Sequence, residues 1–262
     1  MNSVSKTMYI PLYGKAYVSS RGMLLRDPKA EEIWTQEQFP LRGKARSRWL
    51  AYYMAMRAAA IDSWVLARTG EDPEAVVLHI GCGMDSRALR LEKVGNPWFD
   101  IDFPEVIRER KRYYRETERY RMLCGDVTEE QWLAEIPGER AIVVMEGVSM
   151  YLPPERLLAA LRGLHSRFRQ VVLIMDCYTE LAAKMSRLRN PVRDMGVSRV
   201  YGMDDPELLR EAGLELTEEL EITPGYLQAQ LPEKEQRIFR SLYAGGVSRR
   251  LYRLYSWKSG AE

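Results

Sequence analysis

Histidine is the scarcest catalytic residue type of this 262-residue chain, which has only His79 and His165. Histidine supplies the ligands of many metal sites and the general base of Ser-His-Asp hydrolases. We therefore expect no bound metal and no Ser-His-Asp site. A bound cofactor, or some other group, must then supply the chemistry. His79 lies within a short apolar run, which favours a packed core histidine over a catalytic base.

Cysteine, excess charge and long apolar runs are also lacking. Cys82, Cys124 and Cys177 are odd in number and too widely spaced for a zinc pattern, which favours a reducing compartment. Without a signal-peptide pattern or an apolar run of about 18 residues, we expect a cytoplasmic protein that has no membrane partner. Lys+Arg 39 and Asp+Glu 37 nearly balance, which argues against nucleic acid as a partner.

Five short apolar runs alternate with helical segments in the middle of the chain. They lack the polar alternation of half-exposed strands, which indicates strands covered on both faces. Their alternation with helices predicts an α/β fold with a doubly wound, mostly parallel, Rossmann-like sheet. Segments 214–222 and 249–257 bring the predicted sheet to seven strands. The five apolar runs are 75–80, 97–102, 121–126, 141–146 and 171–176.

The two ends of the chain are less regular. Proline and glycine punctuate residues 1–43 and predict irregular chain, followed by a helix over 44–68. We expect residues 1–70 to form an N-terminal helical lid on a Rossmann-like domain of residues 71–262. The insertions expected in that domain are residues 178–203, which look helical, and residues 223–248, which look rich in loops.

Two shorter helices are expected between the strands. Residues 104–119 predict a helix whose interleaved arginines and glutamates form a solvated, charge-balanced face. Thr128 and Gln131 have the spacing of a capping box, which predicts a short helix there.

Ligands of open parallel sheets bind outside the carboxyl ends of the strands, so the residues that follow each strand are the candidates. The first strand is followed by Gly81, Cys82 and Gly83, whose glycines allow a tight turn and a close approach of backbone to ligand. A dinucleotide fingerprint needs a third glycine where Ser86 stands. Asp85, at the start of the next helix, would repel a pyrophosphate.

Carboxylates follow the second strand. Asp100 and Asp102 stand about 20 residues after Gly81, where an acidic side chain can accept hydrogen bonds from ribose hydroxyls. Asp102 could equally cap the helix that follows.

The next two strands also end at carboxylates. Asp126, beside Val127, could accept an adenine amine or be an ordinary loop residue. Glu146, before Gly147, ends an apolar run and needs a cationic partner, from either a cofactor or a protein arginine. Carboxylates at successive strand ends suit a cationic nucleoside such as S-adenosylmethionine. Its methyl group is already activated, so transfer requires only alignment and exclusion of water.

The amino-acid sequences of five segments in this region resemble those of the leucine carboxyl methyltransferase family, which includes the tetracenomycin-type polyketide O-methyltransferases. The resemblance covers about residues 45–176 and implies a class I methyltransferase that uses S-adenosylmethionine. It also implies methyl transfer to a hydroxyl or carboxyl oxygen of a small molecule, since the substrate region of the eukaryotic members is not recognisable here. The segments are MRAAAIDSWV, LHIGCGMDSRALRL, FDIDFPEVIRERK, CGDV and VVMEGVSMYLP.

The resemblance implies individual roles. Arg57, otherwise interpreted as a surface charge, would hold the methionine carboxylate of the cofactor through its guanidinium group. Asp102 would bind the ribose, and Tyr151 would lie near the methyl group. The expected cofactor-binding residues are Arg57, Gly81, Cys82, Gly83, Asp100, Asp102, Asp126, Val127, Glu146 and Gly147.

The acceptor decides whether a base is needed. A carboxylate acceptor needs none, whereas a hydroxyl acceptor loses a proton. The candidate bases are Tyr151, Asp176, Tyr178 and Tyr201. Two other functions are considered: an NAD(P)-dependent dehydrogenase on the same sheet, and a non-catalytic cofactor-binding or scaffold protein.

Overall fold

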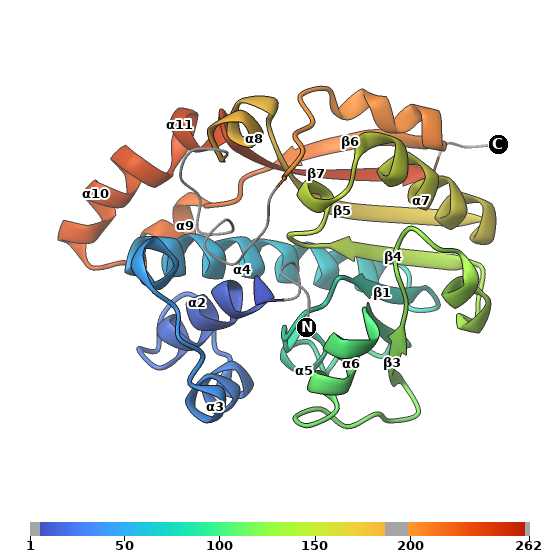
Figure 1. The fold of residues 1–262 in the computed structure, drawn as a ribbon, viewed down its shortest axis with the longest axis horizontal. Coiled ribbons are helices and arrows are strands. Elements are labelled where there is room, and N and C mark those ends of the chain that lie inside the picture. Colours follow the sequence, from blue (N-terminus) through green and yellow to red (C-terminus); the bar gives the residue numbers. More distant parts are fainter. Residues whose placement is uncertain (1–5, 187–198, 260–262) are drawn as a thin grey trace.

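A seven-stranded sheet forms the centre of the computed structural model, which describes residues 6–186 and 199–259 (Figure 1). The strands are β1 (Val76–Ile80), β2 (Trp98–Asp102), β3 (Tyr120–Cys124), β4 (Arg140–Met145), β5 (Gln170–Tyr178), β6 (Leu214–Leu220) and β7 (Tyr252–Ser259). Their order in the sheet is β3-β2-β1-β4-β5-β7-β6. Strands β1 to β5 are parallel, and β7 is antiparallel to both of its neighbours.

Helices connect the strands and cover both faces of the sheet. The longer ones are α2 (Tyr9–Ser19), α3 (Pro28–Glu37), α4 (Arg48–Glu71), α7 (Pro154–Arg167) and α10 (Glu233–Tyr243). The shorter α-helices are α5 (Arg87–Arg90), α6 (Pro104–Arg110), α8 (Glu180–Ser186), α9 (Gly225–Gln228) and α11 (Gly245–Arg249). The 3-10 helices are η1 (Gly43–Arg46), η2 (Gln131–Glu135), η3 (Ser149–Tyr151) and η5 (Pro206–Ala212).

Burial on both faces explains why the strands are continuous apolar runs. In β1, Val77 belongs to the core cluster beneath α2 and α4, whereas Leu78 belongs to the cluster beneath α7 and η5. Successive side chains of a strand point to opposite faces, so each apolar residue finds a helix-covered core on its own side. The expected doubly wound, mostly parallel seven-stranded sheet is thereby confirmed.

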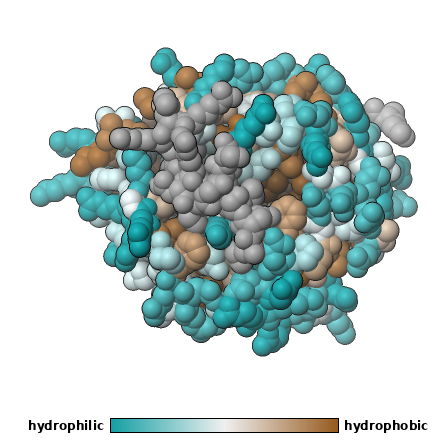
Figure 2. Space-filling model, viewed as in Figure 1, coloured by the Kyte–Doolittle hydropathy of each residue, from teal (hydrophilic) through white to brown (hydrophobic). Residues whose placement is uncertain are grey.

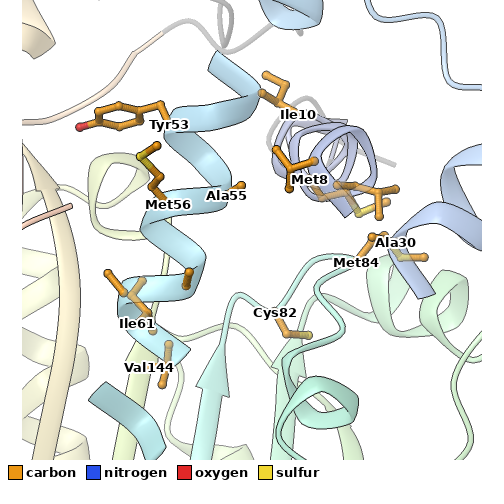
Figure 3. Close-up of a cluster of buried hydrophobic side chains, with 14 of the residues drawn as sticks. Met8, Ile10, Ala30, Tyr53, Ala55, Met56, Ile61, Cys82, Met84 and Val144 are labelled. Atoms are coloured by element: carbon orange, nitrogen blue, oxygen red, sulfur yellow. The ribbon is translucent and has the colours of Figure 1, made fainter. Parts of the chain in front are cut away.

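Residues 6–43 are mostly helical and not irregular, which corrects the interpretation of their prolines and glycines. Pro11 lies in the first turn of α2, where its missing N–H costs nothing, and Pro28 begins α3 after the N-cap Asp27. Gly14 lies inside α2, where an added Cβ would come within 3.3 Å of the Ala51 backbone of α4. The glycine therefore allows close helix packing rather than a break. In Figure 3, Ile10 lies beside α4, and Met8 lies nearer the loop that carries Cys82 and Met84.

The segment 223–248 is also helical rather than rich in loops. Pro224 and Pro232 are the N-caps of α9 and α10, so each of these prolines directly precedes a helix. Helix α10 is amphipathic and inserts the fully buried Phe239 toward α4, while charged residues occupy its outer side.

Two other expectations need correction, and a third is tested only in part. The helix expected over 104–119 ends at Arg110. The capping box at Thr128 does not form, because Asp126 accepts hydrogen bonds from the Thr128 backbone and hydroxyl, and η2 starts only at Gln131. Of the helical segment expected over 178–203, the structure shows α8, and residues 187–198 lie outside the described residues.

Candidate active site

A cavity of about 510 Å³ opens at the carboxyl ends of the parallel strands. Its floor is made by the residues that follow β1, β2, β3 and β4, and its other walls by the start of α2, by α4 and by Tyr252 of β7. The face seen in Figure 2 is hydrophilic at its rim and hollowed near the centre, where apolar residues are visible. The site thus lies where ligands of open α/β sheets bind.

Most of the residues selected from the sequence line this cavity. Those that line it are Arg57, Gly81, Cys82, Gly83, Asp102, Asp126, Val127, Glu146, Gly147, Tyr151 and Tyr178. Three do not: Asp100 and Asp176 are fully buried, and Tyr201 lines a separate cavity beside η5.

The glycines after β1 are required by backbone geometry. Gly81 has φ +68°, and a Cβ there would lie 2.3 Å from Cγ2 of Val148. Gly83 has φ +51°, and its N–H donates a hydrogen bond of 2.8 Å to Oδ2 of Asp102. Both positions need the left-handed conformation that glycine adopts without strain.

Asp102 does not cap α6 in the usual way, because the N-cap is Phe103 and has no side-chain cap. Its carboxylate instead joins the glycine loop to the start of α6, accepting from the N–H groups of Gly83 and Phe103. Burial raises the pKa of Asp102 to about 6, although both N–H donors and Arg110 oppose the shift. Across residues 6–186 and 199–259, no ion pair is found for this carboxylate.

Asp100 lies two residues back from the end of β2, inside the sheet and away from the cavity. It accepts hydrogen bonds from Trp98, Tyr120 and Arg110. Burial works against its ionisation, but Arg110, His79 and Tyr120 together outweigh burial and lower the pKa of Asp100. With its carboxylate used inside the protein, Asp100 is not placed to contact ribose, contrary to the expectation from its spacing.

Arg110 was expected on the solvated face of its helix, yet it is fully buried. Besides Asp100, its guanidinium donates to the carbonyl oxygens of Gly83 at 2.7 Å and Asp85 at 2.9 Å. Arg110 therefore stabilises the glycine loop through hydrogen bonds to its backbone carbonyl groups. The interleaved charges of residues 104–119 hid this role, because one buried arginine among several exposed ones has the same sequence pattern.

Arg57 occupies a buried position on α4 at the cavity wall. Its Nε and Nη2 donate to Oε1 of Glu146 at 3.1 and 2.8 Å, and its Nη1 donates to Oδ2 of Asp176 at 2.7 Å. Burial disfavours the charge of Glu146, but Arg57 and Arg87 outweigh it and lower the pKa of Glu146. The partner of Glu146 is thus protein arginine, one of the two alternatives left open by the sequence.

The Arg57 pair belongs to a larger buried ion network centred on Arg87, the arginine of the run GCGMDSR. Arg87 donates to Asp62 of α4 at 2.7 Å and to Glu146 at 2.5 Å. Arg90 pairs with Asp62, Asp27 and Asp85, and Lys15 pairs with Asp85 at 3.0 Å. The members are the cations Lys15, Arg57, Arg87 and Arg90 and the carboxylates Asp27, Asp62, Asp85, Glu146 and Asp176.

Asp85 has a different role from the one expected. Burial opposes its ionisation, yet Arg90, Lys15 and Arg87 surround it and hold the pKa of Asp85 well below its usual range. Its charge is therefore compensated within the protein. Lys15 is a lining residue that no sequence pattern identified, because it is a single lysine in a segment expected to be irregular.

His79 is a core histidine, as expected from its place in an apolar strand. Its Nε2 lies 3.1 Å from Nη1 of Arg87, and its Nδ1 lies 3.4 Å from Asp100. Burial is the main cause of the lowered pKa of His79, which keeps the ring neutral at neutral pH. A neutral ring accepts from Arg87 and supports the ion network instead of acting on a ligand.

The fold and the site together define a class of protein. A magnesium protoporphyrin IX methyltransferase from Synechocystis, crystallised with S-adenosylhomocysteine, has 13% sequence identity and a TM-score of 0.52. The alignment covers 89% of this chain and 100% of that chain. A DUF574 family protein from Streptomyces avermitilis has 12% identity and a TM-score of 0.58, covering 89% and 90% of the two chains. The fold is that of the class I methyltransferases.

The family is more specific than the fold. The chain belongs to the leucine carboxyl methyltransferase family, whose profile matches residues 12–165. It is 29% identical to the tetracenomycin polyketide synthesis O-methyltransferase of Streptomyces glaucescens, over 84% of this chain and 83% of the relative. It is also 29% identical to an S-adenosyl-L-methionine-dependent methyltransferase of Gibberella zeae, over 63% and 61% of the two chains. The protein is a methyltransferase, and its methyl donor is S-adenosylmethionine.

Two further searches concern only the part of the chain that the structure describes. Within it, no group of three or more His, Cys, Asp or Glu side chains is arranged to hold a metal ion. No helix there has the length and apolar character needed to cross a membrane.

Replacing Arg87 by methionine removes the central charge and keeps much of the side-chain volume. Asp62 and Glu146 would then be buried next to an excess of negative charge, so Arg87→Met should lower the free energy of unfolding by about 3–5 kcal/mol. The exposed Arg108 is the matched control, and Arg108→Ala should change it by less than about 0.5 kcal/mol. Urea unfolding measures both, and equal stabilities would contradict the central role of Arg87.

Proposed function

We propose that this methyltransferase transfers the methyl group of S-adenosylmethionine to an oxygen of a small organic molecule. The charge of the cavity wall is the observation that carries the proposal. The lining residues include the four carboxylates Asp85, Asp102, Asp126 and Glu146 and the three cations Lys15, Arg57 and Arg156, so carboxylates exceed cations by one. The donor has a sulfonium, an ammonium and a carboxylate, and hence one net positive charge, which complements this wall.

The lining residues fit the parts of the donor. Asp102 would accept hydrogen bonds from the ribose hydroxyls, and its raised pKa is consistent with a carboxylate that has no cationic partner of its own. Asp126 and Val127 would frame the adenine. Arg57 would hold the methionine carboxylate, beside Glu146.

Gly147 supports the assignment of Arg57. A Cβ added to Gly147 would lie 3.8 Å from both Nη1 and Nη2 of Arg57, so a side chain at this position would contact the guanidinium. Among the described residues, four of the five guanidinium N–H groups donate to Glu146, Asp176 and Tyr252, which leaves one N–H of Nη2 to donate to a carboxylate.

The donor supplies an activated methyl group on sulfur, so the protein's task is to align the acceptor and exclude water. The start of α2 serves the second purpose. Thr7, Met8 and Ile10 line the cavity, and Oγ1 of Thr7 lies 3.2 Å from the hydroxyl of Tyr151. We propose that residues 1–70 act as a lid on the domain of residues 71–262.

The proposed methyl acceptor is a hydroxyl or a carboxyl oxygen of the small molecule. Asp176 is a poor candidate base, because its oxygens accept from Arg57, Tyr252 and Gly147. Tyr201 lines another cavity, and burial raises the pKa of Tyr151 above its ordinary value. Tyr178 is the remaining candidate that lines the cavity.

The similarity to a polyketide O-methyltransferase supports a small-molecule acceptor. We propose a cytoplasmic location on the evidence of the sequence and of three free cysteines.

Donor binding tests the function directly. Isothermal titration should show binding of S-adenosylhomocysteine by the wild type, and Arg57→Ala and Asp102→Ala should each weaken it at least about tenfold, since each removes a charged partner. Arg108→Ala is the control and should bind as the wild type does.

Absence of binding by the wild type would contradict the proposal. A melting temperature that rises when NAD(P) is added would favour a dehydrogenase instead. Donor binding without turnover across a broad screen of phenols and carboxylic acids, using methyl-labelled donor, would favour a non-catalytic protein.

The pKa of Asp102 adds a pH dependence. Below about pH 6 the carboxyl group is protonated and loses acceptor capacity toward the ribose hydroxyls. Affinity for S-adenosylhomocysteine should therefore be highest above pH 6 and about tenfold weaker at pH 5 than at pH 7.5. Asp102→Asn should bind more weakly but show little change over this range. A wild-type affinity that is constant from pH 5 to pH 7.5 would contradict the role of Asp102.

A further inference from the structure

We propose that Tyr252, which no sequence pattern singles out, is a positioning residue for the methyl donor. Its hydroxyl fixes the guanidinium of Arg57 at the cavity wall, in the orientation that binds the amino-acid part of the donor. The inference rests on the proposed function, in which Arg57 holds the donor's carboxylate.

The contacts of Tyr252 form a closed triangle. Its hydroxyl accepts from Nη1 of Arg57 at 2.5 Å and donates to Oδ2 of Asp176. The same Nη1 donates to the same Oδ2 at 2.7 Å. Each of the three groups therefore contacts the other two, and moving the hydroxyl breaks two hydrogen bonds with charged groups. Such bonds are stronger than those between neutral groups.

The ring of Tyr252 is itself held from both sides. Tyr178 of β5 meets it edge to face with centroids 4.9 Å apart, and Tyr53 of α4 stacks at 6.1 Å. Only 7% of Tyr252 is exposed. The ring packing and the burial of Tyr252, which belongs to the antiparallel strand β7, therefore hold its hydroxyl in one position.

The opposite side of Arg57 is fixed by Glu146, which accepts from Nε and Nη2. Glu146 and the Tyr252–Asp176 pair thus hold the guanidinium at its two ends. Among the described residues, the one guanidinium N–H that has no partner is on Nη2, which lies beside Gly147. Arg57, Gly147 and Tyr252 all line the cavity, whereas Asp176 is fully buried and acts through the other two.

A purely structural role for the hydroxyl makes a different prediction from a positioning role. If Tyr252 only stabilises the core, its removal should weaken all nucleoside ligands alike. If it positions Arg57, its removal should weaken ligands that have the amino-acid part and spare those that lack it. S-adenosylhomocysteine and 5′-methylthioadenosine are such a pair, because the second keeps the adenosine and the sulfur but has no amino-acid part.

The experiment measures both ligands on wild type, Tyr252→Phe and the matched control Tyr53→Phe. Tyr53 is the neighbouring buried ring, but its hydroxyl pairs with Ser248 at 3.0 Å and it does not line the cavity. Calorimetry gives the dissociation constants, with thermal shift at millimolar ligand where binding is weak. Tyr252→Phe should weaken S-adenosylhomocysteine about tenfold, since a guanidinium and a carboxylate each lose a buried partner. It should change methylthioadenosine binding less than about twofold, as should Tyr53→Phe for both ligands.

Equal weakening of the two ligands by Tyr252→Phe, or no weakening of either, overturns the inference. An equal loss in Tyr53→Phe also overturns it. If Tyr252→Phe fails to fold, Asp176→Asn tests the same triangle and should show the same selectivity. A wild type that does not bind S-adenosylhomocysteine overturns the proposed function, and the inference with it, whereas wild-type binding without selectivity overturns the inference alone.

Discussion

The buried guanidinium of Arg87 joins parts of the chain that are far apart in sequence. It pairs with Asp62 of α4 and with Glu146 after β4, and lies 3.6 Å from Asp85 of the glycine loop. Through Asp62 and Asp85 it is linked to Arg90 and Lys15, and through Glu146 to Arg57. Three sides of the cavity are thereby tied to one residue.

Such a network is costly to bury, because each charge loses its hydration. A hydrophobic cluster of equal volume would stabilise the fold at least as well. Removal of one member leaves the charges of its partners uncompensated and lowers the free energy of unfolding by about 3–5 kcal/mol. This is a large share of the roughly 5–15 kcal/mol by which a whole domain is typically stable. The network therefore gives the cavity wall a fixed geometry. The lining carboxylates exceed the lining cations by one, which suits a cationic donor. The cost of burial is consistent with selection for binding rather than for stability alone.

Much of the sheet could be predicted, because strands buried on both faces leave continuous apolar runs. Most carboxylates and glycines at the strand ends were correctly expected to lie together, since the carboxyl ends of parallel strands meet at one edge. Asp102 and Gly81 are examples. Asp100 was misassigned because its spacing resembles that of Asp102, whereas its neighbours Arg110 and Tyr120 were not visible in the sequence.

Residues that reach the site from distant elements could not be predicted. Lys15 comes from α2, where Pro11 and Gly14 suggested irregular chain although one is tolerated in a first turn and the other permits close packing. Tyr252 comes from β7, and its role depends on pairing with β5 that no local pattern encodes. Arg87 lies in the resembling segment, but its partner Asp62 is visible only in three dimensions. Tertiary contacts, not local propensity, decide these positions.

The most direct test of the account is a crystal structure of the complex with S-adenosylhomocysteine. It should show the ribose hydroxyls on Asp102, the amino-acid carboxylate on Nη2 of Arg57 beside Gly147, and the Arg87–Glu146 and Arg57–Glu146 pairs intact. A nucleoside bound away from Asp102, or a complex in which Arg57 leaves Glu146 and Asp176, would contradict it.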